Sequence, residues 1–176
     1  LVAFNDSSSA QKVQVTWGTQ SFAYKLKTFE GATFTWAGSQ TGGYQVRAAS
    51  QQIQASSYSD TSGLESEITS DTGGGYDLGF SSDGDWAVYR HIDFGSGVTS
   101  VRIRVASAGN GGNLELHLNS ASGPLIGSVV IPVTGGWQTW TTVSGSVSGV
   151  SGVSDLYIVF KGTTSIGNVN WLQFKP

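Results

Sequence analysis

Apolar side chains recur at every second position along most of this chain, which is the spacing of a β-strand and not of a helix. Residues 13–17, 101–105 and 114–118 alternate strictly between apolar and polar side chains. Because successive side chains of a strand point to opposite faces, each segment is predicted to be a strand with one buried and one solvated face.

Two further segments, residues 125–131 and 156–160, are almost continuously apolar, which predicts central strands covered on both faces. Clusters rich in glycine separate the predicted strands, at residues 71–75, 109–113 and 134–136. Glycine supplies the positive φ that tight turns require. Many short strands with turn signals between them indicate an all-β fold, a β-sandwich or β-jelly roll.

The composition excludes several classes of function. The 176 residues carry a formal net charge of −3, whereas a nucleic-acid binder needs a clustered basic surface. The absence of cysteine excludes disulfides, thiolate zinc sites and cysteine nucleophiles. No stretch reaches the ~18 consecutive apolar residues of a membrane span. Only 12% of the residues are charged, and hydroxyl, amide and glycine residues take their place, as in many secreted polysaccharide-degrading proteins.

Small polar residues at positions 37–43 interrupt the strand pattern and predict a boundary, which divides the chain into residues 1–41 and 42–176. The first part has room for about four strands, too few to bury a full core alone. We therefore expect it to be an incomplete domain with unpaired strand edges, or a flap packed on the rest. The chain opens in the middle of a strand pattern, as a fragment of a longer protein would.

Trp137 follows Gly135 and Gly136, so it is predicted to lie in a loop with its ring exposed. Sugar rings present C–H patches that stack on flat aromatic side chains, and fixed polar groups can then read their hydroxyls. The alternative is that Trp137 caps the core, as Trp140 is expected to do. The sequence pattern alone leaves both interpretations open.

From residue 44 to residue 176 the chain resembles a family 6 carbohydrate-binding module, a β-jelly roll grouped with families 35 and 36. The blocks that carry the resemblance are Thr69–Phe80, Asp83–Trp86, Arg104–Ser107, Gly135–Trp140, Asp155–Phe160 and Asn168–Trp171. They occur in the family's order over three quarters of the chain. The resemblance implies a non-catalytic module that tethers an enzyme to polysaccharide.

The resemblance also implies a binding cleft at one end of the jelly roll, where two aromatic rings enclose a sugar and an asparagine exchanges hydrogen bonds with it. The matching positions here are Phe80, Trp137 and Asn168, with Glu67 as an acidic residue found in some members. Phe80 departs from the usual tyrosine and lacks its hydroxyl. The alternatives are a core residue for Phe80, a turn side chain for Asn168 and a solvated strand residue for Glu67.

Family members often hold a structural calcium through an acidic pair in a first strand and an aspartate near the C-terminus. The matching positions are Gln54, Ser56 and Asn170, which are all neutral. Because calcium prefers charged oxygen ligands, the resemblance implies a weakened site, and a calcium held by carbonyl oxygens stays open. No other cofactor is implied.

The first part of the chain resembles the last strands of the β-domain that closes a family 30 glycoside hydrolase. The resemblance covers residues 1–37 and rests on Asn5–Gln11, Gln20–Tyr24 and Ala32–Trp36. It implies a fragment of a secreted, extracellular hydrolase, a xylanase or glucuronoxylanase, whose covalently linked catalytic domain is absent. The implied partner is a plant cell-wall polysaccharide, xylan first and β-glucan second.

Two rival hypotheses remain at this point. Asp83 and Asp85 are two residues apart, and a carboxylate pair on one strand face is the arrangement of a small glycosidase. Turn chemistry is the alternative for both aspartates, because Asp-Gly pairs make tight turns. The second rival is a structural module that packs on its enzyme and binds no sugar.

Overall fold

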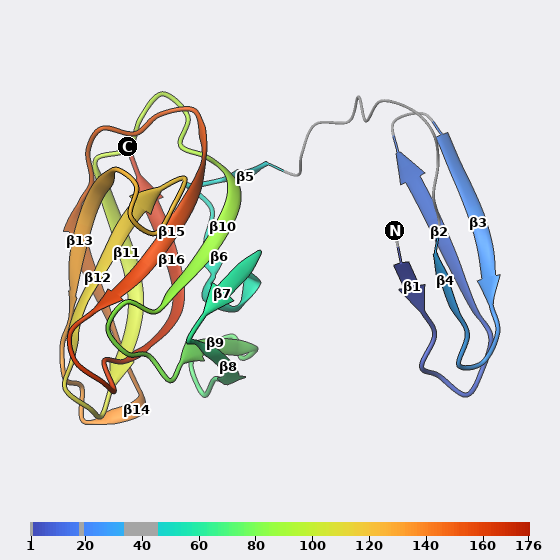
Figure 1. Cartoon of the computed structure of the whole chain (residues 1–176), viewed down its shortest axis with the longest axis horizontal. Coiled ribbons are helices and arrows are strands. Elements are labelled where there is room, and N and C mark those ends of the chain that lie inside the picture. Colours follow the sequence, from blue (N-terminus) through green and yellow to red (C-terminus); the bar gives the residue numbers. More distant parts are fainter. Residues whose placement is uncertain (1, 18–19, 34–45) are drawn as a thin grey trace. The chain divides into compact units, whose positions relative to one another are not determined.

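The computed structural model describes residues 2–17, 20–33 and 46–176 and divides the chain into two units, Leu1–Tyr44 and Gln45–Pro176 (Figure 1). The boundary predicted between residues 41 and 42 falls within residues 34–45, outside the described residues. The described part of the chain contains no helix with the length and apolarity that a membrane crossing requires.

In the described residues of the first unit, four strands form two antiparallel pairs. Strand β1 (Val2–Phe4) pairs with β4 (Gly31–Thr33), and β2 (Gln11–Trp17) pairs with β3 (Gln20–Leu26). The buried side chains described in this unit are Leu26 and Asn5, and Asn5 Nδ2 donates hydrogen bonds to the carbonyls of Ser9 and Lys27. Within the described residues, each strand pairs with one other strand, which leaves its second edge without a partner.

The second unit contains two six-stranded sheets. The first sheet has the order β13-β12-β15-β10-β5, and β7 also pairs with β10. Its strands are β5 (Arg47–Ala48), β7 (Asp60–Ser62), β10 (Trp86–Asp93), β12 (Gly112–Leu118), β13 (Leu125–Ile131) and β15 (Val153–Lys161). Its pairs are antiparallel except for the parallel pair of β5 and β10.

The second sheet has the order β14-β11-β16-β9-β8, and β6 also pairs with β16. Its strands are β6 (Ile53–Gln54), β8 (Glu65–Ile68), β9 (Tyr76–Gly79), β11 (Ser100–Ser107), β14 (Gly136–Ser146) and β16 (Asn168–Lys175). A single 3₁₀ turn, η1 (Ala55–Ser57), follows β6. The two sheets form the β-sandwich that the alternation predicts (Figure 1).

The core lies between these two sheets and takes apolar side chains from both. Leu114 and Phe160 come from the first sheet and Ile103 and Phe174 from the second, and all four are fully buried. Burial of one such side chain stabilises the fold by about 1.5–3 kcal/mol. Strand β11 shows the predicted pattern, because Val101, Ile103 and Val105 are buried while the residues between them are not.

One strand prediction is wrong. Residues 125–131 form β13, which lies at the edge of its sheet and alternates between buried and less buried positions. Residues 156–160 do lie in a central strand, β15, between β10 and β12. The two apolar runs look alike in sequence, and only the order of the strands distinguishes them.

Candidate functional site

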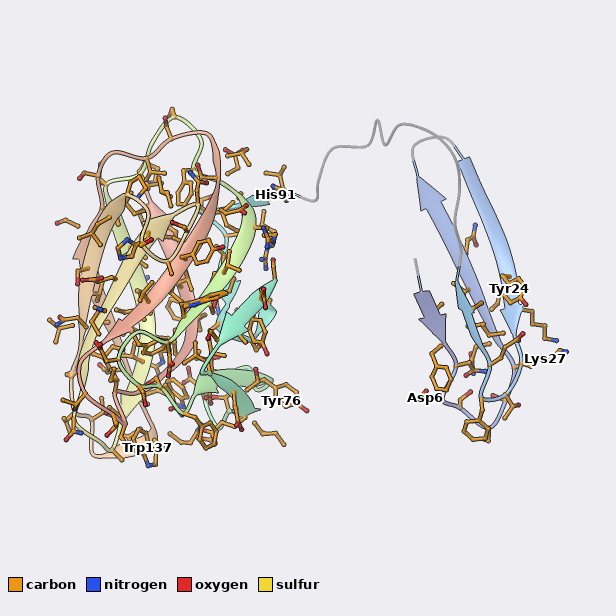
Figure 2. All side chains as sticks on the ribbon, viewed as in Figure 1. Asp6, Tyr24, Lys27, Tyr76, His91 and Trp137 are labelled. Carbon is orange, nitrogen blue, oxygen red and sulfur yellow. The ribbon has the colours of Figure 1, made fainter. Side chains whose placement is uncertain are left out.

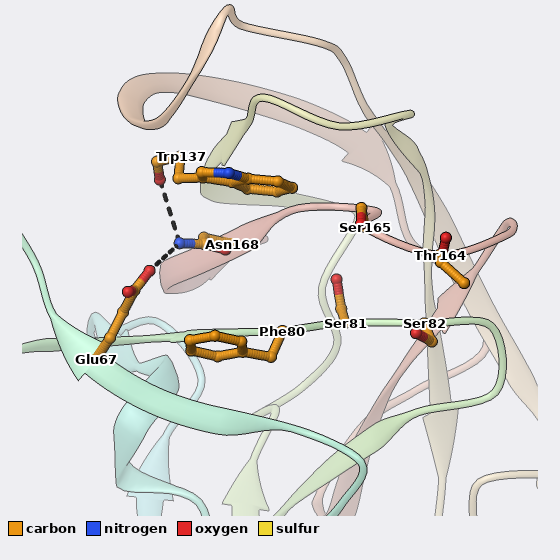
Figure 3. A pocket seen from close by; sticks show the side chains of 8 residues that line it. All are labelled: Glu67, Phe80, Ser81, Ser82, Trp137, Thr164, Ser165 and Asn168. Atoms are coloured by element: carbon orange, nitrogen blue, oxygen red, sulfur yellow. Dashed lines mark hydrogen bonds between the residues drawn. The ribbon is translucent and has the colours of Figure 1, made fainter.

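A cavity of about 340 Å³ opens on the second unit, within the usual ~300–1,000 Å³ range of small-ligand pockets. All four site residues that the sequence predicts line it, and four further hydroxyl residues complete the lining (Figure 3). The eight lining residues are Glu67, Phe80, Ser81, Ser82, Trp137, Thr164, Ser165 and Asn168.

Two aromatic rings lie on opposite sides of the cavity, with Asn168 between them (Figure 3). Phe80 is 63% exposed and Trp137 is 41% exposed, so neither is a core residue. Trp137 lies at one end of the sandwich (Figure 2). Gly109 leaves room for the indole, since a Cβ there would lie 2.8 Å from the ring. The two rings therefore form a platform on each side of a sugar-sized space.

A large bulge in β14 carries Trp137 out of the sheet. Val105 pairs with Thr141 and Ser107 pairs with Gly136, so two steps along β11 correspond to five along β14. Residues 137–140 therefore leave the hydrogen-bonded ladder, as strands do where a side chain must be redirected. The prediction of a loop at Trp137 is wrong, because Trp137 lies inside β14, but the bulge leaves its ring exposed as the loop was expected to do.

Phe80 follows β9 directly and has a φ of 61°, in the left-handed region that non-glycine residues rarely adopt. Ser165, on the other side of the cavity, has a φ of 55°. Strained backbone of this kind gathers at functional sites, where the surrounding structure holds it in place. The left-handed turn at Phe80 ends the strand and leaves the ring exposed beside the cavity.

Asn168 and Glu67 form the polar side of the cavity. Asn168, the first residue of β16, is 2% exposed, and its Nδ2 donates to Glu67 Oε1 at 2.6 Å and to the Trp137 carbonyl at 3.2 Å. Gly79 makes room for this amide, because a Cβ there would lie 2.6 Å from Asn168 Oδ1. Asn168 therefore links the bulge of β14 to the β8–β9 hairpin. It does not stabilise a local turn, which was the alternative interpretation of this residue.

A buried polar cluster connects with this side of the cavity. Gln138 Nε2 donates to Glu67 Oε1 at 3.3 Å and to Asp77 Oδ2 at 2.8 Å. Asp77 is fully buried, and its Oδ1 has no partner among the described residues. Burial, together with the nearby Glu67 carboxylate, raises the pKa of Asp77 to about 6.

The loop between β8 and β9 is fixed by an ion pair between the buried Asp71 carboxylate and the half-buried Arg104 side chain. Arg104 donates to both carboxylate oxygens of Asp71, with Nε–Oδ2 at 2.9 Å and Nη2–Oδ1 at 2.8 Å. The Arg104 guanidinium lowers the pKa of Asp71, and the Asn170 amide adds a hydrogen bond at 2.8 Å. Gly73, Gly74 and Gly75 complete this loop with φ values of 100°, 65° and 92°.

The sequence analysis did not select Gln138 or Asp77 as residues that support the site, and its prediction for Trp140 is wrong. Trp140 does not cap the core. It is half-buried, and its Nε1 donates to Gln138 Oε1 at 3.2 Å. The local pattern held no signal for Gln138, because residues 137–140 lie in the bulge of β14, outside the paired ladder.

The aspartates of the glycosidase hypothesis satisfy turns and lie outside the cavity. Asp85 Oδ2 accepts from the Ser82 amide at 2.7 Å, and Asp83 Oδ1 accepts from the Gly162 amide at 3.0 Å. They precede β10 in a turn at Gly84, whose φ is 85°. Asp83 and Asp85 therefore stabilise turns, and they do not form the carboxylate pair on one strand face that the glycosidase hypothesis requires.

The residues at the expected calcium positions offer that ion neutral oxygen atoms, among them the buried Asn170 Oδ1, which has no partner among the described residues. Gln54 and Ser56 supply no carboxylate, and the Asn170 amide already donates to Asp71. Within the described residues, no group of three or more His, Cys, Asp or Glu side chains is arranged to hold a metal ion. Calcium needs several oxygen ligands, usually with carboxylates among them.

Comparison with known proteins decides the family. Residues 54–176 match the family model described as carbohydrate binding module (family 6). The chain belongs to this family. The residues that line the cavity therefore lie in a non-catalytic carbohydrate-binding module, and the predicted fold class and non-enzymatic role are confirmed.

Solved family 6 modules share the fold and much of the sequence. A module from Clostridium cellulolyticum, solved in complex with xylose, is 46% identical with a TM-score of 0.71, over 74% of this chain and 100% of that chain. A β-1,3-glucan-binding module from Bacillus halodurans is 41% identical with a TM-score of 0.73, over 75% of this chain and 100% of that one.

Among curated relatives, endo-1,4-beta-xylanase A of Thermoclostridium stercorarium is 38% identical over 129 residues, which is 73% of this chain. The family 6 chain spans about a fifth of that relative's length, 19%. The resemblance of residues 1–37 to a family 30 hydrolase stays a prediction.

Proposed function

We propose that the family 6 module holds one neutral sugar unit of a plant cell-wall polysaccharide between Phe80 and Trp137, with xylan preferred and β-glucan second. The observation that carries the proposal is the pair of exposed rings on opposite sides of one cavity, with Asn168 and Glu67 between them. The xylose complex and the xylanase relative favour xylan, and the Bacillus halodurans module favours β-glucan as the second partner.

The charge of the cavity favours a neutral sugar over a uronic acid. Glu67 is the one charged residue that lines it, and no lysine, arginine or histidine is among the lining residues. A glucuronate carboxylate in this space would be repelled by Glu67 without a compensating cation. The module is therefore proposed to bind the unbranched backbone of xylan and not its acidic branches.

The proposed role in the whole protein is to tether an extracellular glycoside hydrolase to insoluble substrate. Each stacked ring contributes about 1 kcal/mol or more, so the module alone binds weakly. Linkage converts this weak binding into a high local enzyme concentration at the polysaccharide surface. The covalently linked catalytic domain is proposed to be a xylanase or glucuronoxylanase.

Affinity electrophoresis in soluble xylan, β-glucan and mannan tests the proposal. We expect retardation in xylan, weaker retardation in β-glucan, and loss of both in the Trp137→Ala variant. Titration with unbranched and glucuronate-branched xylooligosaccharides then tests the charge argument, with the unbranched ligand binding more tightly. Unretarded migration of the parent chain in every gel would favour the structural module that binds no sugar.

A further inference from the structure

The amide of Gln138 is held in one orientation by contacts at both of its ends. Its Oε1 accepts from the Ser70 amide at 2.8 Å and from Trp140 Nε1 at 3.2 Å. Its Nε2 donates to two carboxylates, Glu67 and Asp77. A flipped amide would turn its carbonyl toward both carboxylates and its NH₂ group toward the Ser70 amide and the Trp140 indole, which are both donors, so the network permits a single orientation.

Gln138 in turn restricts Glu67. Glu67 Oε1 accepts from both Gln138 Nε2 and Asn168 Nδ2, which commits one carboxylate oxygen to the protein. Within the described residues, no hydrogen bond reaches Glu67 Oε2 or Asn168 Oδ1, and both residues line the cavity. Each side chain therefore retains one acceptor for the hydroxyl groups of a ligand.

Like charges would disturb this arrangement in the absence of Gln138. The Asp77 carboxylate lies next to Glu67 in the β8–β9 ladder, where the two residues are paired. Gln138 places an NH₂ group between these carboxylates and donates to each of them. The Arg104 guanidinium already donates hydrogen bonds to both carboxylate oxygens of Asp71.

We propose that Gln138 is a positioning residue for sugar recognition: it fixes Glu67 and, through it, Asn168, so that their two remaining acceptors are presented together to neighbouring hydroxyls. The inference rests on the proposed function, because it assigns the cavity to a sugar. Gln138 does not line the cavity and acts through Glu67. The bulge at residues 137–140 serves both tasks, since it presents the Trp137 ring and brings Gln138 to Glu67.

The test is a double-mutant cycle on the full chain, with Kd measured by titration with unbranched xylotetraose. Gln138→Met keeps the length of the side chain and removes its hydrogen bonds, and we expect binding about tenfold weaker. In a Glu67→Ala background the same substitution should change Kd by less than about twofold, because its effect passes through Glu67. Gln173→Met is the matched control, since Gln173 lies in β16 and donates to the Ser50 carbonyl.

Two further measurements keep the test decisive. If Gln138→Met fails to fold, Trp140→Phe removes one donor to the Gln138 amide instead. This substitution should weaken binding several-fold in the parent background and should leave Kd nearly unchanged in the Glu67→Ala background. NMR of the Asn168 side-chain amide in the sugar-free protein should show altered shifts and faster hydrogen exchange when Gln138 is replaced.

The outcomes separate the inference from the proposed function. A parent chain that binds no xylotetraose overturns both. Equal binding by the parent and Gln138→Met, or the same fold-loss with and without Glu67, overturns the positioning role alone. Unchanged Asn168 signals in Gln138→Met also overturn it, whatever the sugar affinity.

Discussion

Replacing Asp77 with asparagine should stabilise the protein near neutral pH. Asp77 is fully buried, with Oδ2 bonded to Gln138 and Oδ1 without a partner among the described residues. Burial, with Glu67 and Asp71 nearby, raises its pKa from 3.8 to about 6. Because the pKa is raised, the folded state binds the proton more tightly, and this contribution to stability is lost as pH rises from about 4 through 6.

The magnitude follows from the two pKa values. The interval from 3.8 to about 6, at about 1.4 kcal/mol per pKa unit, amounts to about 3 kcal/mol at pH 7.5. Asp77→Asn is neutral at every pH and keeps an acceptor for Gln138. The substitution therefore removes the ionisable group without removing the hydrogen bond from Gln138.

Urea unfolding followed by tryptophan fluorescence, repeated between pH 4 and pH 8, measures the effect. The difference in unfolding free energy between Asp77→Asn and the parent should grow by up to about 3 kcal/mol across this range. Asp60→Asn is the control, because Asp60 is an exposed carboxylate in β7, and its difference from the parent should stay nearly constant. A pH-independent difference for Asp77→Asn would refute the reasoning.

Three other substitutions follow from the site. Trp137→Ala should abolish retardation in xylan gels with little change in Tm, because the ring is exposed, whereas truncating a core tryptophan costs about 3–5 kcal/mol; calorimetry provides the Tm. Phe80→Ala should weaken sugar binding about fivefold to tenfold by titration, while Phe29→Ala, a phenylalanine of matching exposure and positive φ in the first unit, should leave Kd unchanged. Asp71→Ala leaves Arg104 without its carboxylate and should lower the unfolding free energy by about 2–4 kcal/mol in urea.

The local pattern of the sequence was sufficient for most of the strands, whereas the four predicted cavity residues came from the resemblance to the family. Strict alternation at residues 101–105 gave the burial of β11 correctly, because alternate side chains of a half-buried strand meet core and solvent. Phe80, Trp137, Asn168 and Glu67 could be selected by their motifs, and the fold brings all four to one cavity.

The order of strands in space lies outside the reach of such patterns. Residues 125–131 were predicted to form a central strand because they are almost continuously apolar, but they form the edge strand β13. The residues of a strand do not specify which strands lie beside it. The contacts of Gln138 with Asp77 and Glu67 join residues 61 and 71 positions apart, and Gln138 makes them from the bulge of β14. The left-handed φ of Phe80 is likewise a property of the folded chain, since phenylalanine has no preference for that region.

The backbone at Phe80 places sugar binding and thermal stability in competition. A phenylalanine at a φ of 61° costs on the order of 1 kcal/mol or more, a strain that glycine at the same position would relieve. Selection of this chain for heat resistance alone would therefore favour Phe80→Gly early and discard one of the two rings that we propose to stack on the sugar. A thermostabilisation programme should keep this position fixed, or screen every round for retardation in xylan.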